Sequence, residues 1–215
     1  VKNKTYYPTN TGMALARALR VTDIVDVDTT ALWEVNLDKI KHGELSYLDF
    51  KKDILKARRM MPDVIIACMH WGIEYRSLPE RSERDLADWM ITQGVDHVIG
   101  SHPHVLQPME VIQDKHTPAK HVVVYSLGNF ISNMSKEDTD GGAMVKLELQ
   151  RIFRITRLIN CEYSLVWTSR PNLSGKKGFE LYPASFLDKP IKNEEVSTMK
   201  RFLMRARILF DTYNR

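Results

Sequence analysis

Three of the seven histidines in this chain lie in two short phrases that are suited to metal binding. His70 follows the apolar run Asp63–Ala67, and the pair His102 and His104 follows a second run, Asp96–Ile99. Neutral imidazole is the commonest metal ligand among side chains. A His-x-His pair can present both rings to one ion, or one ring to each of two neighbouring ions. The three histidines are therefore candidate metal ligands.

The elements before these histidines determine where the rings must lie. Both apolar runs are rich in β-branched residues, which indicates buried and parallel strands. In open α/β proteins, ligands gather outside the carboxyl ends of such strands. Pro103 fixes the backbone between His102 and His104. We therefore expect His70, His102 and His104 to converge at one sheet edge. The alternative is a turn whose imidazoles merely cap backbone groups.

Two polar residues are candidate catalytic residues beside this cluster. Glu74 lies four residues after His70, where it can orient an imidazole, contact substrate or cap the next segment. Asn129 follows a third apolar strand at 122–125, and its amide offers both a donor and an acceptor. It either lines the site or stabilises a turn. The remaining histidines lack comparable settings, and we expect each to be structural or exposed: His42, His97, His116 and His121.

The pattern along the chain predicts an α/β fold in a single domain, residues 1–215. A helix begins near Ser46 and places Phe50, Ile54, Ala57 and Met61 on one face; a second begins near Ser82 and ends at Gly94. Strands are expected at 63–69, 96–100, 121–126, 142–151, 160–169 and 179–182, and a last helix at 193–212. Residues 14–20 and 23–32 weakly suggest a helix and a strand. Parallel units followed by antiparallel strands indicate a mixed β-sandwich flanked by helices.

Composition excludes several classes of protein. The chain is 43% hydrophobic and 27% charged, has no apolar stretch near 18 residues and shows no signal-peptide core, so we expect no transmembrane or targeting segment. Nucleotide-binding loops and serine-hydrolase motifs do not occur. Cys68 and Cys161 are expected to be unpaired structural thiols.

The net charge of +4 is unevenly distributed. Residues 1–150 carry 18 Lys and Arg against 21 Asp and Glu, whereas residues 151–215 carry 13 against 6. The basic C-terminal segment suits an anionic polymer, a membrane surface or a solvated helix face. No alternation of aromatic and basic residues suggests base stacking, so nucleic acid is not an expected partner.

Four phrases in order resemble the poly-γ-glutamate capsule-biosynthesis (CapA-like) family, relatives of calcineurin-like metallophosphoesterases. They are H-W-G-I-E-Y at 70–75, L-A-D-W at 86–89, G-V-D-H-V-I-G-S-H-P-H-V-L-Q-P at 94–108 and Y-S-L-G-N-F at 125–130. The resemblance implies a metallophosphoesterase-like β-sandwich with a metal centre at the sheet ends. It places His70, His102 and His104 as metal ligands, with Glu74 and Asn129 lining the same cleft.

The chain also departs from the family's pattern. The upstream Gly-Asp, acidic and Asn-Asn-His phrases do not occur, and residues 1–35 show no match, so we interpret the chain as a C-terminal portion, incomplete at the N-terminal side. Asp23, Asp26 and Asp28 are weaker candidate ligands. Three imidazoles make an incomplete shell, so we expect a divalent metal (Mn, Zn or Fe) to bind weakly or not at all.

The resemblance leads to a functional expectation with open alternatives. The leading one is a metal-dependent hydrolase-type domain in capsule polymer biosynthesis, inactive as this fragment, which acts on an anionic polymer or a phosphoester at the extracytoplasmic face of the cell envelope. The second is a non-catalytic partner that holds an anionic polymer for a membrane synthase or exporter. The third is a rearranged gene product without activity.

Overall fold

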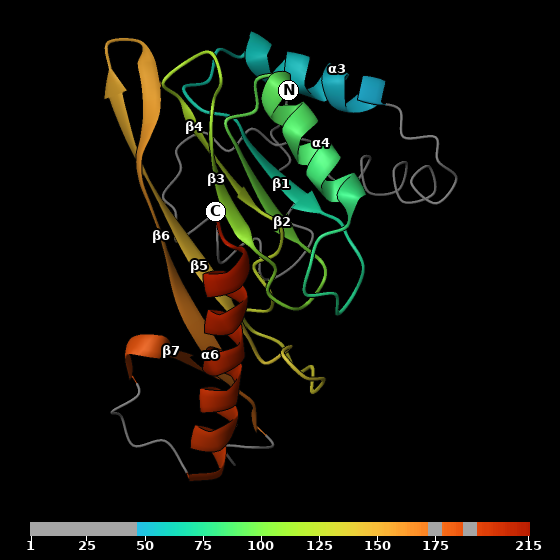
Figure 1. Ribbon diagram of the computed structural model, residues 1–215, viewed down its shortest axis with the longest axis vertical. Coiled ribbons are helices and arrows are strands. Elements are labelled where there is room, and N and C mark those ends of the chain that lie inside the picture. Colours follow the sequence, from blue (N-terminus) through green and yellow to red (C-terminus); the bar gives the residue numbers. More distant parts are fainter. Residues whose placement is uncertain (1–46, 172–177, 187–192) are drawn as a thin grey trace.

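Two β-sheets form the centre of the fold in the computed structural model, which describes residues 47–171, 178–186 and 193–215 (Figure 1). A four-stranded sheet has helices on one side and a three-stranded sheet on the other. The elements in chain order are α3 (Tyr47–Arg59), β1 (Ile66–His70), α4 (Arg81–Thr92), β2 (His97–Ser101), β3 (Met109–Gln113), β4 (Lys120–Val124), β5 (Gly141–Ile152), β6 (Ile155–Ser169), β7 (Glu180–Pro183), the short 3-10 helix η1 (Ala184–Phe186) and α6 (Asn193–Tyr213). The expected α/β sandwich is confirmed.

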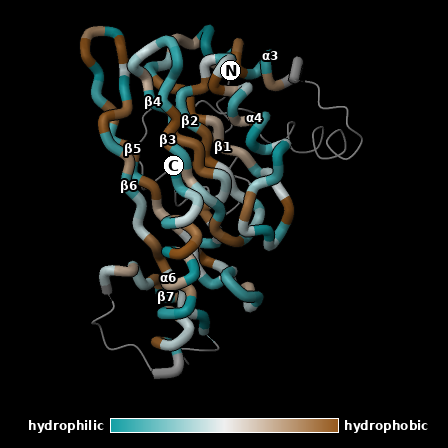
Figure 2. Tube along the Cα trace, in the orientation of Figure 1, coloured by the Kyte–Doolittle hydropathy of each residue, from teal (hydrophilic) through white to brown (hydrophobic). Residues whose placement is uncertain are grey.

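The four-stranded sheet has the order β1-β2-β4-β3. β1, β2 and β4 run parallel, and β3 pairs with β4 in the antiparallel direction. Side chains of β4 alternate between two cores: Val122 and Val124 face the second sheet, while Val123 faces the helices. A sheet buried on both faces needs apolar residues at successive positions, which explains the near-continuous runs in the sequence (Figure 2).

α3 and α4 cover one face of this sheet (Figure 1). Phe50, Ile54 and Ala57 of α3 are buried, as the helical spacing predicts. The placement of Met61 on that face was wrong, because α3 ends at Arg59 and Met61 is 88% exposed with a φ of 52°. Left-handed backbone at Met61 turns the chain out of the helix before Pro62.

α4 begins one residue earlier than the sequence indicated. Its first turn is fixed by the backbone N–H of Glu80, which donates to the Glu83 carboxylate over 2.6 Å. At the other end Gly94 has a φ of 97°, which is the left-handed geometry expected of a glycine after a helix. β2 begins at His97, shortly after Gly94, so the position at which α4 ends limits where β2 can begin.

The second sheet has the order β5-β6-β7 and packs with α6 around a second core. Met199, Leu203, Ala206 and Phe210 of α6 are buried, as predicted, whereas Val196 is only half-buried. Trp167 of β6 is fully buried in the same core and donates its indole N–H to Asp140. The basic charges of α6 lie mainly on its outer side, since this apolar stripe faces inward.

Two features of the sheets differ from the sequence-based prediction. The strands expected at 142–151 and 160–169 form one long hairpin, in which β5 and β6 are joined by a two-residue turn. β3 was missed, because it is only five residues long and its apolar residues Val111 and Ile112 are adjacent, which breaks the alternation typical of a half-buried strand. Cys68 and Cys161 are both unpaired, and Cys68 is exposed.

The elements suggested at 14–20 and 23–32, Ser46, His42 and the aspartates at 23, 26 and 28 lie outside the described residues. Within the described part, no helix has both the length and the apolarity that a membrane crossing requires.

Candidate metal centre

The three candidate histidine ligands lie together at the carboxyl edge of the parallel strands. His70 is the last residue of β1, and His102 follows directly after β2, its neighbour in the sheet. The ring centroids of His70 and His102 are 4.5 Å apart, and those of His102 and His104 are 5.8 Å apart. The convergence expected from their equivalent positions after neighbouring strands is therefore present in the fold.

The backbone that presents these rings adopts an uncommon conformation. His102 and His104 have φ values of 104° and 61°, and Tyr75 in the facing loop has a φ of 65°. Such values are uncommon for residues other than glycine and cost about 1–3 kcal/mol each. The two loops are tied together, because the backbone N–H of Tyr75 donates to the carbonyl of Pro103 over 2.8 Å. Backbone strain of this kind is typical of functional sites.

Glu74, His102 and His104 form a group of potential metal ligands in the described residues. One donor atom from each lies within 4.8 Å of the other two. The nearest approach of Glu74 to His104 is 3.8 Å, from carboxylate oxygen to Nε2. Glu74, predicted as a residue lining the cleft, is therefore placed with the ligand group. His70 stands beside this group, with its ring against His102.

Asn129 holds His104 in a defined orientation. Its side-chain nitrogen donates to the carbonyl of Thr139 over 2.9 Å, and its oxygen lies 3.1 Å from Nδ1 of His104. Because that oxygen can only accept, Nδ1 of His104 must carry the proton. The lone pair of Nε2 then points away from Asn129, on the side of Glu74. The role of the Thr139 carbonyl was not identified from the sequence.

The electrostatic environment keeps two of the rings neutral. Burial, together with the neighbouring rings of His102 and His104, lowers the pKa of His70 to about 4. Burial also lowers the pKa of His102, assisted by His104 and opposed by Glu74. Neutral imidazole is the form that binds metal, so no proton has to be displaced near pH 7.

The edge that carries the site depends on a close contact between β2 and β4. The indole N–H of Trp71 donates to the carbonyl of Tyr125 over 2.9 Å, directly across Gly100. A Cβ on Gly100 would lie 2.1 Å from that carbonyl oxygen and 2.5 Å from the indole nitrogen. Only glycine fits between them, and Trp71 in turn sets the position of the loop after His70.

A cavity of about 490 Å³ adjoins the candidate metal centre. It lies between α6 and the segments around Tyr75, Val105 and Lys136. The ring of Tyr75 is 6.1 Å from that of His104, and the Lys136 ammonium lies 3.4 Å from the centre of the Tyr75 ring. The backbone carbonyl of Lys136 accepts from Thr139, so Lys136 is linked to the same network as Asn129. Neither Tyr75 nor Lys136 was identified from the sequence.

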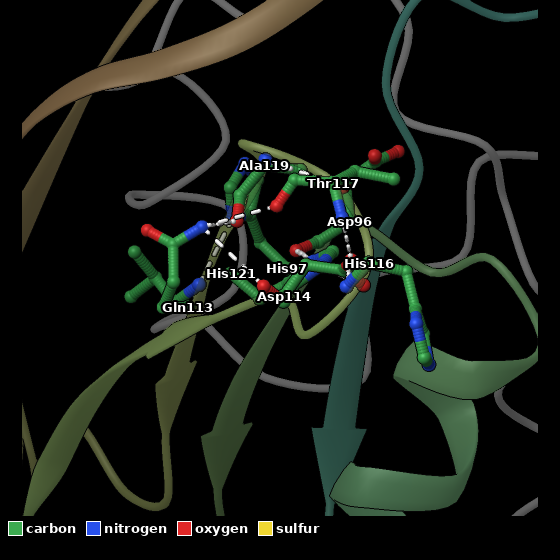
Figure 3. A network of polar contacts seen from close by, with 9 residues as sticks. Asp96, His97, Gln113, Asp114, His116, Thr117, Ala119 and His121 are labelled. Atoms are coloured by element: carbon green, nitrogen blue, oxygen red, sulfur yellow. Dashed lines mark hydrogen bonds and ion pairs between the residues drawn. The ribbon is translucent and has the colours of Figure 1, made fainter.

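The other described histidines do not belong to this centre. His97 and His121 lie at the starts of β2 and β4, at the opposite edge of the sheet (Figure 3). His97 Nδ1 accepts from the Val122 backbone over 3.1 Å, while His121 contacts the carbonyl of Asp96 over 2.9 Å. His116 is exposed. These three are structural or exposed, as expected.

The comparison with known proteins agrees with the motifs. Residues 13–134, more than half of the chain, match the family described as bacterial capsule synthesis protein PGA_cap. The chain belongs to this family. The resemblance drawn from the four phrases is thereby confirmed, and so is the metallophosphoesterase-like fold that it implied. The matched range begins at residue 13. It therefore includes residues 13–35, for which the sequence motifs had shown no match to the family.

Two capsule proteins are similar to this PGA_cap member over a shorter range. The "PGA biosynthesis protein CapA" of Bacillus subtilis (strain 168) is 37% identical over 89 residues, which is 41% of this chain and 22% of that protein. The "Capsule biosynthesis protein CapA" of Bacillus anthracis is 34% identical over 88 residues, 41% of this chain and 20% of that protein. The matched segments thus span about a fifth of the length of these relatives.

Proposed function

We propose that this chain is a metal-dependent hydrolase-type domain of capsule polymer biosynthesis that works at the extracytoplasmic face of the cell envelope. The observation that carries the proposal is the group formed by Glu74, His102 and His104, whose donor atoms lie within 4.8 Å of one another at the carboxyl edge of the sheet. The PGA_cap match supports the capsule context.

The donor set fits a divalent metal. Two imidazoles and one carboxylate are the protein ligands of many catalytic zinc sites and of non-haem iron sites, and the carboxylate also suits Mn²⁺. When bound, such an ion lowers the pKa of a coordinated water and polarises a phosphoryl or acyl oxygen. Asn129 fixes the tautomer of His104, which presents Nε2 as a ligand atom.

The substrate in this proposal is an anionic polymer or a phosphoester. Lys136 supports it, because this cation lies beside the cavity and contacts the Tyr75 ring instead of a carboxylate among the described residues. The other cation of the cavity, Arg205, is already paired with carboxylates, with Glu137 over 2.6 Å and with Asp138 over 2.8 Å. Lys136 is therefore the cation in the cavity lining that pairs with no carboxylate among the described residues.

We propose that residues 1–215 bind metal weakly and do not hydrolyse polymer. Three donors leave a shell that needs further ligands, and an acid for the leaving group must also be positioned. A second candidate function is a non-catalytic partner of a membrane synthase or exporter. The small number of metal-ligand donors favours a protein without catalysis, and the basic residues after 150 suit the binding of an anionic polymer.

Titration with Co²⁺, followed by its visible absorption, tests the metal site. We expect weak stoichiometric binding that is lost in His104→Ala and kept in His116→Ala, a matched change at an exposed histidine. Binding unaffected by His104→Ala would reject the site.

A longer protein that carries the family's upstream Gly-Asp and Asn-Asn-His phrases tests the reaction. We expect it to hydrolyse a phosphodiester or a γ-linked glutamate polymer with Mn²⁺. Polymer binding without turnover under any divalent metal, unaffected by His104→Ala, would favour the binding function instead.

A further inference from the structure

The turn of the β5–β6 hairpin exposes apolar residues that the fold leaves uncovered. Phe153 in the turn is 95% exposed, and the cross-strand pair Ile152 and Ile155 beside it is 53% and 56% exposed. Ile159, next to a bulge in the same hairpin, is 53% exposed. Apolar side chains grouped in this way on a surface mark sites of interaction. We call residues 151–157 the hairpin tip.

Turn chemistry does not account for phenylalanine at this position. Phe153 has a φ of 57° in a two-residue turn, where glycine, asparagine or aspartate is preferred. A bulky residue with left-handed backbone is strained, and burial does not compensate it here because the side chain is exposed. Local strain without a structural benefit indicates a role in function.

The tip is held in shape by Arg151. Its guanidinium donates to the Asp63 carboxylate over 2.6 Å, and its Nε donates to the carbonyl of Phe153 over 3.3 Å. These bonds connect the turn to the segment just before β1. The turn stands at the end of the hairpin away from α6, at the top of Figure 1, so it is free to meet a flat surface.

The charged residues of the tip's own sequence are all basic, and one of them, Arg151, is paired with Asp63. Residues 149–161 contain Arg151, Arg154 and Arg157 and no acidic residue. Arg154 and Arg157 are exposed and pair with no carboxylate in the described part of the chain. Figure 2 shows hydrophobic and hydrophilic positions side by side at this turn. An apolar tip flanked by free arginines matches a bilayer interface, where the apolar groups enter the headgroup region and the guanidinium groups contact lipid phosphates.

We propose that the hairpin tip docks this protein on an anionic lipid bilayer, with Phe153 as its apolar anchor and Arg154 and Arg157 as its headgroup contacts. A polyanion without apolar groups would use the arginines but leave Phe153, Ile152 and Ile155 in water. The proposal is independent of the metal centre, which lies at the carboxyl ends of β1 and β2.

Co-sedimentation of the chain with vesicles tests the proposal. We expect binding to phosphatidylcholine vesicles that contain phosphatidylglycerol, much weaker binding to phosphatidylcholine alone, and loss of binding at high salt. Each arginine near the surface contributes about a fivefold change in affinity, so Arg154→Gln with Arg157→Gln should weaken binding about 25-fold. Lys200→Gln with Arg201→Gln, a matched pair on α6, should bind as the wild type does.

Phe153→Gly separates docking from folding. Glycine relieves the left-handed backbone, so the variant should unfold at the same temperature as the wild type or higher, while its vesicle binding is lost. Phe153→Trp should keep binding and show a blue-shifted fluorescence on anionic vesicles. Unchanged binding of Phe153→Gly, absence of binding by the wild type, or a dimer in light scattering that Phe153→Gly abolishes would overturn the proposal, the last in favour of contact between two copies.

Discussion

Asn129 illustrates how one buried amide defines the chemistry of a neighbouring ring. Its nitrogen bonds to the Thr139 carbonyl, so its oxygen is fixed toward Nδ1 of His104. An aspartate in its place would still accept from Nδ1 of His104 but would add a negative charge and lose the donor to the Thr139 carbonyl, and an alanine would leave the ring without an orienting partner. Asn129 is 7% exposed, which suits a residue that positions His104 better than one that contacts substrate.

We predict that Asn129→Ala weakens Co²⁺ or Zn²⁺ binding about 10- to 100-fold, the usual effect of removing a partner of a metal-bound histidine. His102→Ala and His104→Ala should abolish binding, while His70→Ala should have a smaller effect, since His70 lies beside the donor group of Glu74, His102 and His104. Isothermal titration of each variant measures these affinities. Equal losses for His70→Ala and His104→Ala would instead make His70 a full ligand.

At the same scale, Lys136→Met should weaken the binding of a γ-linked glutamate oligomer about fivefold, since an exposed charge pair contributes up to about 1 kcal/mol. Lys115→Met, a change at an exposed loop residue, serves as the control. The effect should shrink as salt is added. Equal oligomer affinities for the two variants would remove Lys136 from the proposed site.

At the scale of the elements, the spacing between β2 and β4 is set by Gly100. A Cβ at this position meets the backbone of Tyr125, directly after β4, and the Trp71 indole, neither of which can move without disturbing the loop after His70. We predict that Gly100→Ala lowers the free energy of unfolding by about 3 kcal/mol. Gly178→Ala, where the new Cβ would meet no atom within 4 Å, should change it by less than about 0.5 kcal/mol. Urea unfolding of both variants provides the comparison.

At the scale of the whole molecule, stability should depend on pH through buried histidines. Burial, assisted by the neighbouring His121, lowers the pKa of His97 to about 4, whereas an unfolded histidine titrates near 6.5. Below about pH 6.5 the unfolded chain therefore takes up a proton that the folded chain does not. Folding loses stability from about pH 6.5 down to about pH 4, and His97 alone accounts for about 2 kcal/mol between pH 7 and pH 5.

Replacement of His97 tests this dependence. His97→Asn keeps an acceptor for the Val122 N–H and removes the titrating group, so the loss of stability between pH 7 and pH 5 should be about 2 kcal/mol smaller than in the wild type. His116→Asn, at an exposed position, should retain the wild-type dependence. If His97→Asn loses as much stability as the wild type over this range, His97 is not the group responsible.

The amino-acid sequence by itself determined most of the described helices and strands, β3 excepted, and the edge at which the site lies. Apolar runs of β-branched residues specify parallel strands, and the histidines directly after them must then lie at one sheet edge, because parallel neighbours end on the same side. The helical stripes of α3 and α6 were readable for the same reason: local periodicity reflects burial. The predicted burial of Met61 was wrong, because the spacing of apolar residues does not predict the backbone φ at which a helix ends.

Only the tertiary structure decided which side chains meet within that edge. Glu74 joins His102 and His104 because Tyr75 and Pro103 tie two loops together, and Lys136 reaches Tyr75 from a segment more than 60 residues away. The exposure of Phe153 also could not be predicted from the sequence, because a phenylalanine side chain is usually buried. Such contacts depend on long-range packing, whose partners are far apart in the chain, so no local pattern in the sequence encodes them.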